Sequence, residues 1–333
     1  MKKILGIGNA LVDVLIPLEN EERLRMLDLP KGSMQLVDRN RSRAILDLLK
    51  DYSWSKAAGG SAANTIHGLA RLGAETGYIG VIGEDELGGS FVKDMIDAGV
   101  EPHLIHSTVE TGRAVALITP DSERTFATYL GAAIGLTAEH LEQASDFFSR
   151  YDLLHLEGYL VQNHDLVKKA LLLARQHRMK VSLDLASYNV VEANREFLDG
   201  NIREFVDVVF ANEEEAKAFT GKDPKDALDA IGEICEIAVV KTGKNGSLVR
   251  RGREMEEIGI IPVIPVDTTG AGDLYASGFL YGLAGGLPLK RCGETGALLA
   301  GHVIEVMGAK LTERKWQLIR DFLVSGTGEQ VNR

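Results

Sequence analysis

Positions 267–273 of this 333-residue chain read Asp-Thr-Thr-Gly-Ala-Gly-Asp. This motif combines carboxylates, hydroxyls and glycines at a spacing that could form a reactive site. An extended run at 260–266 precedes this motif, and an apolar segment with helical spacing follows it. Glycine accepts positive φ and lets a ligand approach the backbone closely. We therefore expect the N–H groups of Gly270, Ala271 and Gly272 to form an anion hole at the start of a helix, where unpaired donors and the helix dipole favour negative charge.

Asp273 falls in the first turn of this predicted helix, beside the anion hole. A carboxylate held there can take the proton of a substrate hydroxyl as that hydroxyl attacks a phosphoryl group. An Asp after a tight turn is also a common helix N-cap. The order of extended run, seven-residue motif and helix favours a phosphoryl-transfer site over a simple cap.

The motif resembles the D-T-x-G-A-G-D signature of the ribokinase-like (PfkB) carbohydrate kinases. Gly59–Asn64 (GGSAAN) resembles the N-terminal signature of the same family, and Gly83–Gly88 (GEDELG) resembles its G-x-D-x-x-G element. The resemblance extends over nearly the whole chain. It implies that Asp273 is the catalytic base and that the three N–H groups at 270–272 bind the transferring phosphoryl group.

The resemblance also implies an acceptor site in the N-terminal part of the chain. A carboxylate offers several acceptor positions and can hold two vicinal hydroxyls, which is the role implied for Asp13. Asn64 is implied to hydrogen-bond substrate hydroxyls, and the diglycine before it to form a hinge. The alternative is a polar turn after the first strand and an ordinary loop that enters a helix. The implied substrate-binding residues are Asn9, Asp13, Gly59, Gly60 and Asn64.

Two further segments are implied to bind the nucleotide. Asn212 with Glu215 matches the N-x-x-E element that organises Mg²⁺ and phosphate, Glu215 acting largely through water. Asn followed by Glu three residues later is also a helix capping box, so this assignment depends on the resemblance. Thr242, Gly243 and Gly246 are implied to surround the phosphates and ribose of ATP, although the Asn-Gly pair at the end of this segment also predicts a hairpin turn.

Arg124 follows a Pro-Asp turn signal and resembles an arginine that a lid brings to the phosphates; an exposed surface arginine is the alternative. Asp267, Thr269 and Gly308 resemble positions whose oxygens coordinate a monovalent cation in this family. The sequence leaves a requirement for K⁺ open.

The elements that must position these residues follow a regular alternation. Short β-branched runs alternate with longer segments of helical period, which is typical of a parallel sheet with crossover helices. The predicted strands are Lys3–Gly8, Thr76–Ile82, Leu153–Glu157, Lys180–Asp184, Val206–Asn212 and Ile237–Thr242. The predicted helices are Ser61–Leu72, Leu87–Ala98, Asn163–His177 and Glu213–Phe219. Because several strands are fully apolar, we expect a sheet covered on both faces, that is, an α/β protein with the three-layer α/β/α ribokinase-like fold and a mostly parallel sheet.

Two stretches break this alternation. Residues 13–55 are rich in turn signals and contain a predicted helix near Ser42–Leu49, and residues 108–131 alternate like two paired strands. We expect both insertions to form a small β lid over the site, with an edge hairpin as the alternative. The core then consists of three segments, residues 1–12, 56–107 and 132–333.

The composition limits the possible partners. A formal net charge of −11 argues against nucleic acid, whose backbone binds basic surfaces. Cys235 and Cys292 are too few for a disulfide framework or a zinc site, and no apolar run reaches the length of a membrane span. We expect a cytoplasmic protein with small-molecule partners; the oligomeric state, a homodimer included, stays open.

Together these features predict an ATP-dependent kinase that uses Mg-ATP to phosphorylate a primary hydroxyl of a sugar or nucleoside. A ribofuranosyl, adenosine-like acceptor is favoured, because residues 8–13 and 29–35 are more similar to the adenosine kinase-like branch of the family. An apolar wall for a base is expected from Leu29, Met34, Leu36, Phe126 and Tyr129.

Two other functions stay open: a free-sugar kinase, and a non-catalytic nucleotide or sugar sensor on the same fold. A nicotinamide-dependent oxidoreductase is excluded, because Leu11 stands where the glycine fingerprint begun by Gly6 and Gly8 needs a third glycine or alanine. A P-loop NTPase is excluded as well, because the chain contains no G-x-x-x-x-G-K-[ST] motif.

Overall fold

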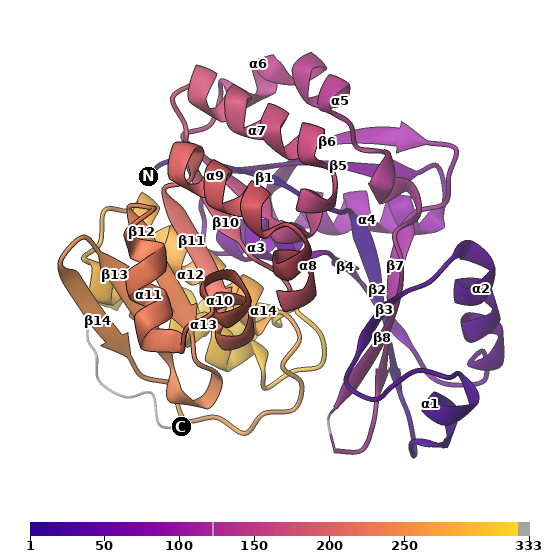
Figure 1. Cartoon of the computed structure of the whole chain (residues 1–333). Helices are drawn as coiled ribbons and strands as arrows, with labels where there is room; N and C mark the ends of the chain where they lie inside the picture. The colour runs from indigo at the N-terminus through magenta and orange to yellow at the C-terminus, as the bar shows by residue number, and fades with distance from the viewer. Residues whose placement is uncertain (122, 326–333) are drawn as a thin grey trace.

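The computed structural model describes residues 1–121 and 123–325, and these residues form two β-sheets (Figure 1). The larger sheet contains β1 (Ile4–Ile7), β5 (Thr76–Gly83), β6 (Val100–Ser107), β9 (Leu153–Glu157), β10 (Lys180–Asp184), β11 (Val208–Asn212), β12 (Ile237–Lys241), β13 (Ser247–Arg251) and β14 (Glu254–Ile258). Its strand order is β14-β13-β12-β11-β10-β9-β1-β5-β6. The strands from β12 to β6 pair in parallel, and β13 and β14 extend one edge as antiparallel strands. The predicted mostly parallel sheet is confirmed.

Helices cover both faces of this sheet. One layer contains α5 (Ala138–Gln143), α6 (Ser145–Phe148), α7 (His164–Gln176), α8 (Tyr188–Ala193), α9 (Arg195–Phe205), α10 (Glu213–Thr220) and α11 (Pro224–Gly232). The other contains α3 (Ser61–Arg71), α4 (Glu86–Asp97), α12 (Ala271–Ala284) and α13 (Leu289–Val303), and α14 (Glu313–Ser325) packs on this second layer. Short 3₁₀ turns follow three of the strands: η1 (Gly131–Gly135), η2 (Gly158–Gln162) and η3 (Gly243–Asn245).

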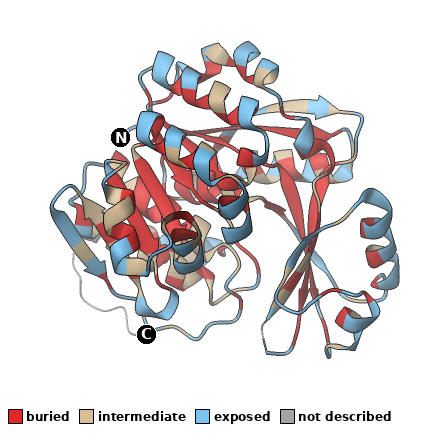
Figure 2. Cartoon of the chain, in the orientation of Figure 1, coloured by how far each residue is buried: buried red, intermediate tan, exposed pale blue. Residues whose placement is uncertain are grey.

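The apolar strands explain the three layers, because successive side chains of a strand point to opposite faces. In β11, Val209 and Ala211 pack into the core below one helical layer, while Val208 and Phe210 pack into the core below the other. Figure 2 accordingly shows the central strands buried and the helices buried only along the side that meets the sheet. A strand without a polar face needs cover on both sides, as the sequence indicated.

The second sheet is five-stranded over the described residues and projects from the larger unit (Figure 1, lower right). Its strands, in spatial order, are β3 (Met34–Leu36), β8 (Arg124–Tyr129), β7 (Gly112–Ile118), β2 (Leu11–Pro17) and β4 (Ser55–Gly59). The predicted strand pair is the antiparallel hairpin of β7 and β8. Helices α1 (Glu22–Met26) and α2 (Arg39–Leu48) cover one face of this sheet through a core that includes Ile45, Leu117 and Ala127.

One predicted element is wrong. In the described part of the chain, the expected extended run at 260–266 belongs to no strand. The N–H groups of Val266 and Asp267 instead donate to the carbonyl oxygen of Ile304. Ile260 and Ile264 are exposed, so this run has no sheet surface on which its apolar side chains could pack, and β-propensity without such a surface is weak.

Within residues 1–121 and 123–325, no helix is both long enough and apolar enough to cross a lipid bilayer.

Candidate active site

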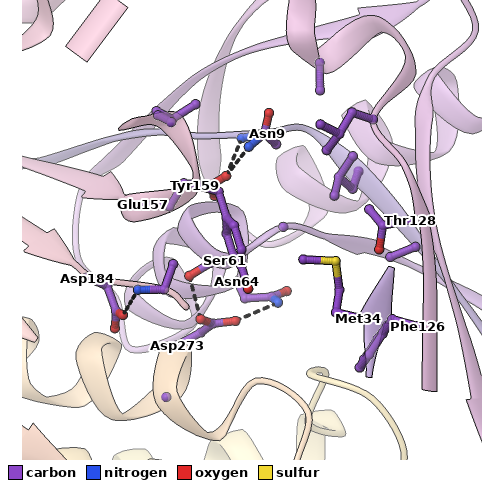
Figure 3. A pocket seen from close by; sticks show the side chains of 18 of the residues that line it. Asn9, Met34, Ser61, Asn64, Phe126, Thr128, Glu157, Tyr159, Asp184 and Asp273 are labelled. Carbon is purple, nitrogen blue, oxygen red and sulfur yellow. Dashed lines mark hydrogen bonds between the residues drawn. The ribbon is translucent and has the colours of Figure 1, made fainter. Parts of the chain in front are cut away.

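A cavity of about 810 Å³ lies between the large sheet and the open face of the second sheet. The ends of β9 to β12 contribute to its lining, as do the starts of α3 and α12 and strands β3 and β8 (Figure 3). The carboxyl ends of parallel strands meet at one sheet edge, which is where open α/β sheets bind ligands. The cavity is therefore the place to compare with the predicted site residues.

Asp273 is the third residue of α12, and its side chain lines the cavity. Ser61 Oγ donates to its Oδ1 at 2.7 Å, and Asn64 Nδ2 donates to its Oδ2 at 3.0 Å (Figure 3). Burial raises the pKa of Asp273 to about 6, against the lowering effect of these two hydrogen bonds. At neutral pH the group is therefore largely a carboxylate that has lost much of its hydration, as a general base requires.

A side chain at either of the two glycines before Asp273 would come too close to a neighbouring residue. Gly270 has a φ of +72°, and a Cβ there would lie 2.5 Å from Cβ of Ala309. A Cβ on Gly272 would lie 3.0 Å from Nζ of Lys241. Ala271, the third expected donor of the anion hole, has its N–H 3.3 Å from the carbonyl oxygen of Thr268. That bond is long, so the group is held in a turn and only weakly engaged.

The structure brings the predicted acceptor residues together at the cavity. Asp13 is buried, and burial, offset in part by Lys310, raises its pKa to about 7. A Cβ on Gly59 would lie 2.2 Å from Oδ1 of Asp13. Gly60 has a φ of +95°, and its Cβ would lie 2.1 Å from the carbonyl oxygen of Asn9. Both positions therefore require glycine, because the Asp13 side chain approaches the backbone at Gly59 and the Asn9 carbonyl approaches it at Gly60.

Sequence reasoning missed Glu157, the last residue of β9, which is 1% exposed. Its Oε1 accepts from the backbone N–H of Asn9 at 2.9 Å and from Asn9 Nδ2 at 2.6 Å, and its Oε2 accepts from the N–H of Ala62 at 2.9 Å. Burial raises its pKa to about 7 even though these bonds lower it. Glu157 therefore ties the loop after β1 to the start of α3, and Asn9 faces this carboxylate rather than standing free for substrate.

Asn212 and Glu215 form the capping box that was the alternative interpretation of this pair. Asn212 Oδ1 accepts from the N–H of Glu215 at 2.8 Å, and Glu215 Oε2 accepts from the N–H of Asn212 at 2.8 Å. Both residues also line the cavity. Burial and the carboxylate of Asp184 raise the pKa of Glu215. A cation or a hydrogen-bond donor on the cavity side would therefore stabilise its ionised form.

A second feature that sequence reasoning missed joins the ends of β10 and β12. Lys241 Nζ lies 2.8 Å from Oδ2 of Asp184, and both side chains line the cavity. Like Glu157, each is a charged residue at the carboxyl end of a largely buried strand, and that pattern could have identified them. Of the three expected nucleotide-binding residues in the following segment, Gly243 lines the cavity.

The other two, Thr242 and Gly246, lie in the turn between β12 and β13, where the N–H of Thr242 donates to the carbonyl oxygen of Gly246. The expected hairpin turn is confirmed. A Cβ on Gly246 would lie 1.9 Å from the carbonyl oxygen of Ile258, which explains this glycine without a ligand. A role of Thr242 and Gly246 in nucleotide binding stays a proposal.

Arg124 crosses from the second sheet to the motif. Its Nε lies 2.5 Å from Oδ1 of Asp267, and its Nη2 donates to Oγ1 of Thr268 at 2.5 Å. Asp267 Oδ1 also accepts from the N–H of Thr269 at 2.9 Å, and its Oδ2 accepts from the N–H of Gly308 at 2.6 Å. Gly308 thus presents a donor to Asp267. These contacts satisfy the carboxylate with protein donors, so it does not fit a site for a monovalent cation such as K⁺.

The apolar wall differs in part from the predicted one. Met34, Leu36 and Phe126 line the cavity, as expected (Figure 3 labels Met34 and Phe126). The prediction is wrong for Leu29, which packs in the core under α1 and α2, and for Tyr129, whose ring lies 5.2 Å from the guanidinium carbon of Arg113. For Tyr129 the reason is the alternation of β8, in which Phe126 and Thr128 face the cavity while Ala127 and Tyr129 face away from it.

The described part of the cavity offers few protein ligands for a divalent cation. Within the described residues, no cluster of three or more His, Cys, Asp or Glu side chains is arranged to hold a metal ion. Mg²⁺ normally keeps several waters and binds through one or two carboxylates plus substrate phosphates. A single buried, cavity-lining carboxylate such as Glu215 fits that kind of site.

Comparison with known proteins identifies the family. A family model described as pfkB family carbohydrate kinase matches residues 34–316, and the chain belongs to this family. The adenosine kinase of Saccharomyces cerevisiae is 28% identical over 334 residues, covering 94% of this chain and 97% of the yeast protein. The 5-dehydro-2-deoxygluconokinase of Geobacillus kaustophilus is 30% identical over 284 residues, covering 80% and 85%.

Among solved structures, the adenosine kinase from Sinorhizobium meliloti superposes with a TM-score of 0.88 at 33% identity, covering 96% of this chain and 99% of that one. The chain is a sugar or nucleoside kinase of the adenosine kinase-like branch. The three-layer ribokinase-like fold expected from the sequence is confirmed.

Proposed function

We propose that this protein transfers the γ-phosphate of ATP to the primary hydroxyl of a ribofuranosyl acceptor, with adenosine or a related nucleoside preferred. The observation that carries the proposal is Asp273, a buried carboxylate with a pKa raised to about 6, at the start of α12 and facing a cavity of about 810 Å³. The same cavity is lined by Asp13 and by the apolar side chains of β3 and β8.

In the proposed reaction the acceptor lies with its ring hydroxyls on Asp13 and Asn64. Asn64 Nδ2 is engaged by Asp273, and among the described residues Asn64 Oδ1 has no hydrogen-bond partner, so this oxygen can accept from a hydroxyl. The primary hydroxyl then gives its proton to Asp273 as its oxygen attacks the γ-phosphorus. The oxygen–phosphorus bond to the acceptor forms, the bond to ADP breaks, and the first-turn N–H groups at residues 270–272 stabilise the charge on the transferring group.

We propose that Mg²⁺ accompanies ATP and is held through water by Glu215, which the Asn212 capping box orients. When bound, it would neutralise charge on the phosphates. The raised pKa of Glu215 supports this, because an unneutralised buried carboxylate favours a nearby cation.

The choice of acceptor rests on the apolar wall and on the relatives. A base needs a surface to stack on, and Phe126, Met34 and Leu36 supply one in the cavity that Asp13 also lines. Adenosine kinases occur among the relatives and among the solved structures. A free-sugar acceptor is the second candidate, since the Geobacillus kaustophilus relative is named for a sugar acid and Phe126 is the one aromatic ring that β3 and β8 contribute to the cavity lining.

The acceptor is tested by comparing kcat/KM for adenosine, inosine, ribose and fructose at saturating Mg-ATP. Adenosine should be preferred over ribose by about tenfold or more, because stacking and apolar burial of a base contribute about 1–3 kcal/mol. A preference of tenfold or more for a free sugar would contradict the nucleoside acceptor and leave the kinase standing. Absence of turnover with every acceptor tried would instead support a non-catalytic sensor.

We also propose that residues 13–55 and 108–131 act as a lid on a core of residues 1–12, 56–107 and 132–333. Arg124 supports this, because it connects β8 of the second sheet to Asp267 and Thr268 of the core and is placed to move with the lid. A closed lid would keep water from accepting the phosphoryl group.

If the lid closes over the acceptor, amide hydrogen exchange in β3, β7 and β8 should slow by about tenfold or more when the acceptor and an unreactive ATP analogue bind. Strand β14, at the far edge of the large sheet, serves as the internal control and should keep its exchange rate. Unchanged protection in all three lid strands, with binding verified independently, would contradict closure.

A further inference from the structure

Lys241 has no role in the scheme above, yet its position is unusual for a lysine. It ends β12, its side chain is 16% exposed, and it lines the same cavity as Asp273. Its ammonium lies 2.8 Å from Oδ2 of Asp184 at the end of β10. A Cβ on Gly272 would lie 3.0 Å from Nζ, so the ammonium rests against the first turn of α12. Asp184 and Asp273 both line this cavity and are labelled in Figure 3.

Two features of this position oppose a positive charge, and the carboxylates around Lys241 offset them. Lysine is rarely buried, and the N-terminus of a helix is its positive end. An ammonium that only balanced Asp184 would be better placed away from that end. Here the ammonium and the first-turn N–H groups of α12 converge on the same space, beside the carboxylate that would take the acceptor's proton. An arrangement of this kind is stabilised by an anionic ligand such as a phosphoryl group.

The carboxylates around Lys241 keep it charged. Burial by itself lowers the pKa of Lys241, but Asp184, Glu215 and, more weakly, Asp273 outweigh burial and leave the pKa above its usual value. The group therefore cannot act as a base at neutral pH. It can serve as a fixed positive charge with three N–H donors, of which Asp184 takes one.

We propose that the ammonium of Lys241 binds the oxygens of the transferring phosphoryl group, and that Asp184 is the positioning residue that holds it against α12. The inference rests on the proposed phosphoryl transfer. During transfer Lys241 keeps its proton: the acceptor's proton goes to Asp273, the new phosphorus–oxygen bond forms on the acceptor, and ADP leaves with the electrons of the broken bond. Lys241 is then a catalytic residue that neutralises charge on the phosphoryl oxygens, as lysines do in other phosphoryl-transfer sites.

The test compares Lys241→Met with Lys241→Gln, which keeps a donor for Asp184 but lacks the charge. Both should lower kcat by about 10²–10³-fold, the usual effect of removing one donor to a developing negative charge. The dissociation constant of ADP should change by less than about threefold, whereas affinity for ADP with aluminium fluoride and acceptor, a mimic of the transferring group, should fall about tenfold or more. Lys180→Met is the matched control, because Lys180 pairs with Asp207 at the opposite end of β10 and should leave kcat unchanged.

Each outcome decides between the two proposals. A Lys241→Gln protein that keeps more than about a third of the wild-type kcat would overturn the role of Lys241 and leave the kinase proposal intact. Equal losses of affinity for ADP and for the aluminium fluoride complex would also overturn it, because they indicate a structural role. A wild-type protein that phosphorylates no acceptor would instead overturn the proposed function itself. If Lys241→Met unfolds, Lys241→Gln alone decides.

Discussion

Replacing Asp273 with Asn should lower kcat by about 10²–10⁴-fold, the range expected for loss of a general base. The substitution keeps the size and shape of the side chain but removes the group that takes the acceptor's proton. Affinity for ATP should change by less than about threefold, because the side chain is placed to face the acceptor's hydroxyl. Steady-state kinetics with the best acceptor, together with a nucleotide-binding titration, measure both quantities.

The Asp273→Asn variant should fold, so a loss of kcat can be attributed to catalysis and not to a loss of stability. Asn64 Oδ1 has no partner among the described residues, so a flip of the Asn64 amide lets it accept from the amide introduced by Asp273→Asn while Ser61 keeps its bond. Because the folded-state pKa of Asp273 is raised from 3.8 to about 6, its stabilising contribution is present below pH 3.8 and lost as the pH rises through 6. At pH 8 the variant should therefore melt no lower than the wild type.

The wild-type pH profile gives a further check on Asp273. The base must be unprotonated, so wild-type kcat/KM should fall as the pH drops through about 6. The residual rate of the variant should lack that fall. A variant that retains more than about a tenth of the wild-type kcat would refute the assignment of Asp273.

Removal of Glu157 should have the largest effect on stability. Glu157→Leu would leave the backbone N–H of Asn9, its side-chain amide and the N–H of Ala62 buried without their acceptor. Each such donor costs about 1–3 kcal/mol, and removal of one partner from a buried charged contact costs about 3–5 kcal/mol. The free energy of unfolding should therefore fall by about 3–5 kcal/mol, the lower part of the sum for three donors. Urea or thermal unfolding measures the loss. KM for the acceptor should rise in parallel, because Glu157 ties the segment that carries Asn9 and Asp13 to the start of α3.

Glu101 provides the matched control for Glu157. Its carboxylate also accepts several hydrogen bonds, from both terminal nitrogens of Arg150 and from the hydroxyl of Tyr151, but it is about half exposed. Water can replace lost partners there, so Glu101→Leu should cost less than about 1 kcal/mol. Comparable losses at the two positions would show that burial of the donors does not explain the effect at Glu157.

The class of protein and the centre of the candidate site could be predicted from local sequence patterns alone. The motif at 267–273 is contiguous, so its chemistry could be predicted without knowing what else lies nearby. The helix after it and the positive φ of Gly270 follow from local preferences that the structure reproduces. The apolar strands were equally informative, because a strand such as β11 with no polar face requires helices on both sides.

A pair of residues three positions apart could be recognised in the sequence, but its role could not be assigned from the spacing alone. Asn212 and Glu215 read equally as a capping box and as a cation-binding element, and the structure shows that one pair of side chains forms the box while lining the cavity. The assignments of Leu29 and Tyr129 to the apolar wall failed for a related reason. Composition showed that apolar residues were available in both insertions. The face that Tyr129 occupies depends on the alternation and register of β8, and Leu29 lies outside the strands, in the core of the second sheet.

The contacts between charged groups from distant parts of the chain could not be predicted in this way. Glu157, Asp184 and Lys241 are isolated charges at strand ends, separated along the chain by 27 and 57 residues. The order β12-β11-β10-β9 of parallel strands brings their ends to one edge of the sheet, and the positions of α3 and α12 then place Ser61 and Asp273 beside them. Sequence periodicity reports which way a side chain faces within its own element, whereas contacts between these charges depend on long-range strand pairing that no local pattern encodes.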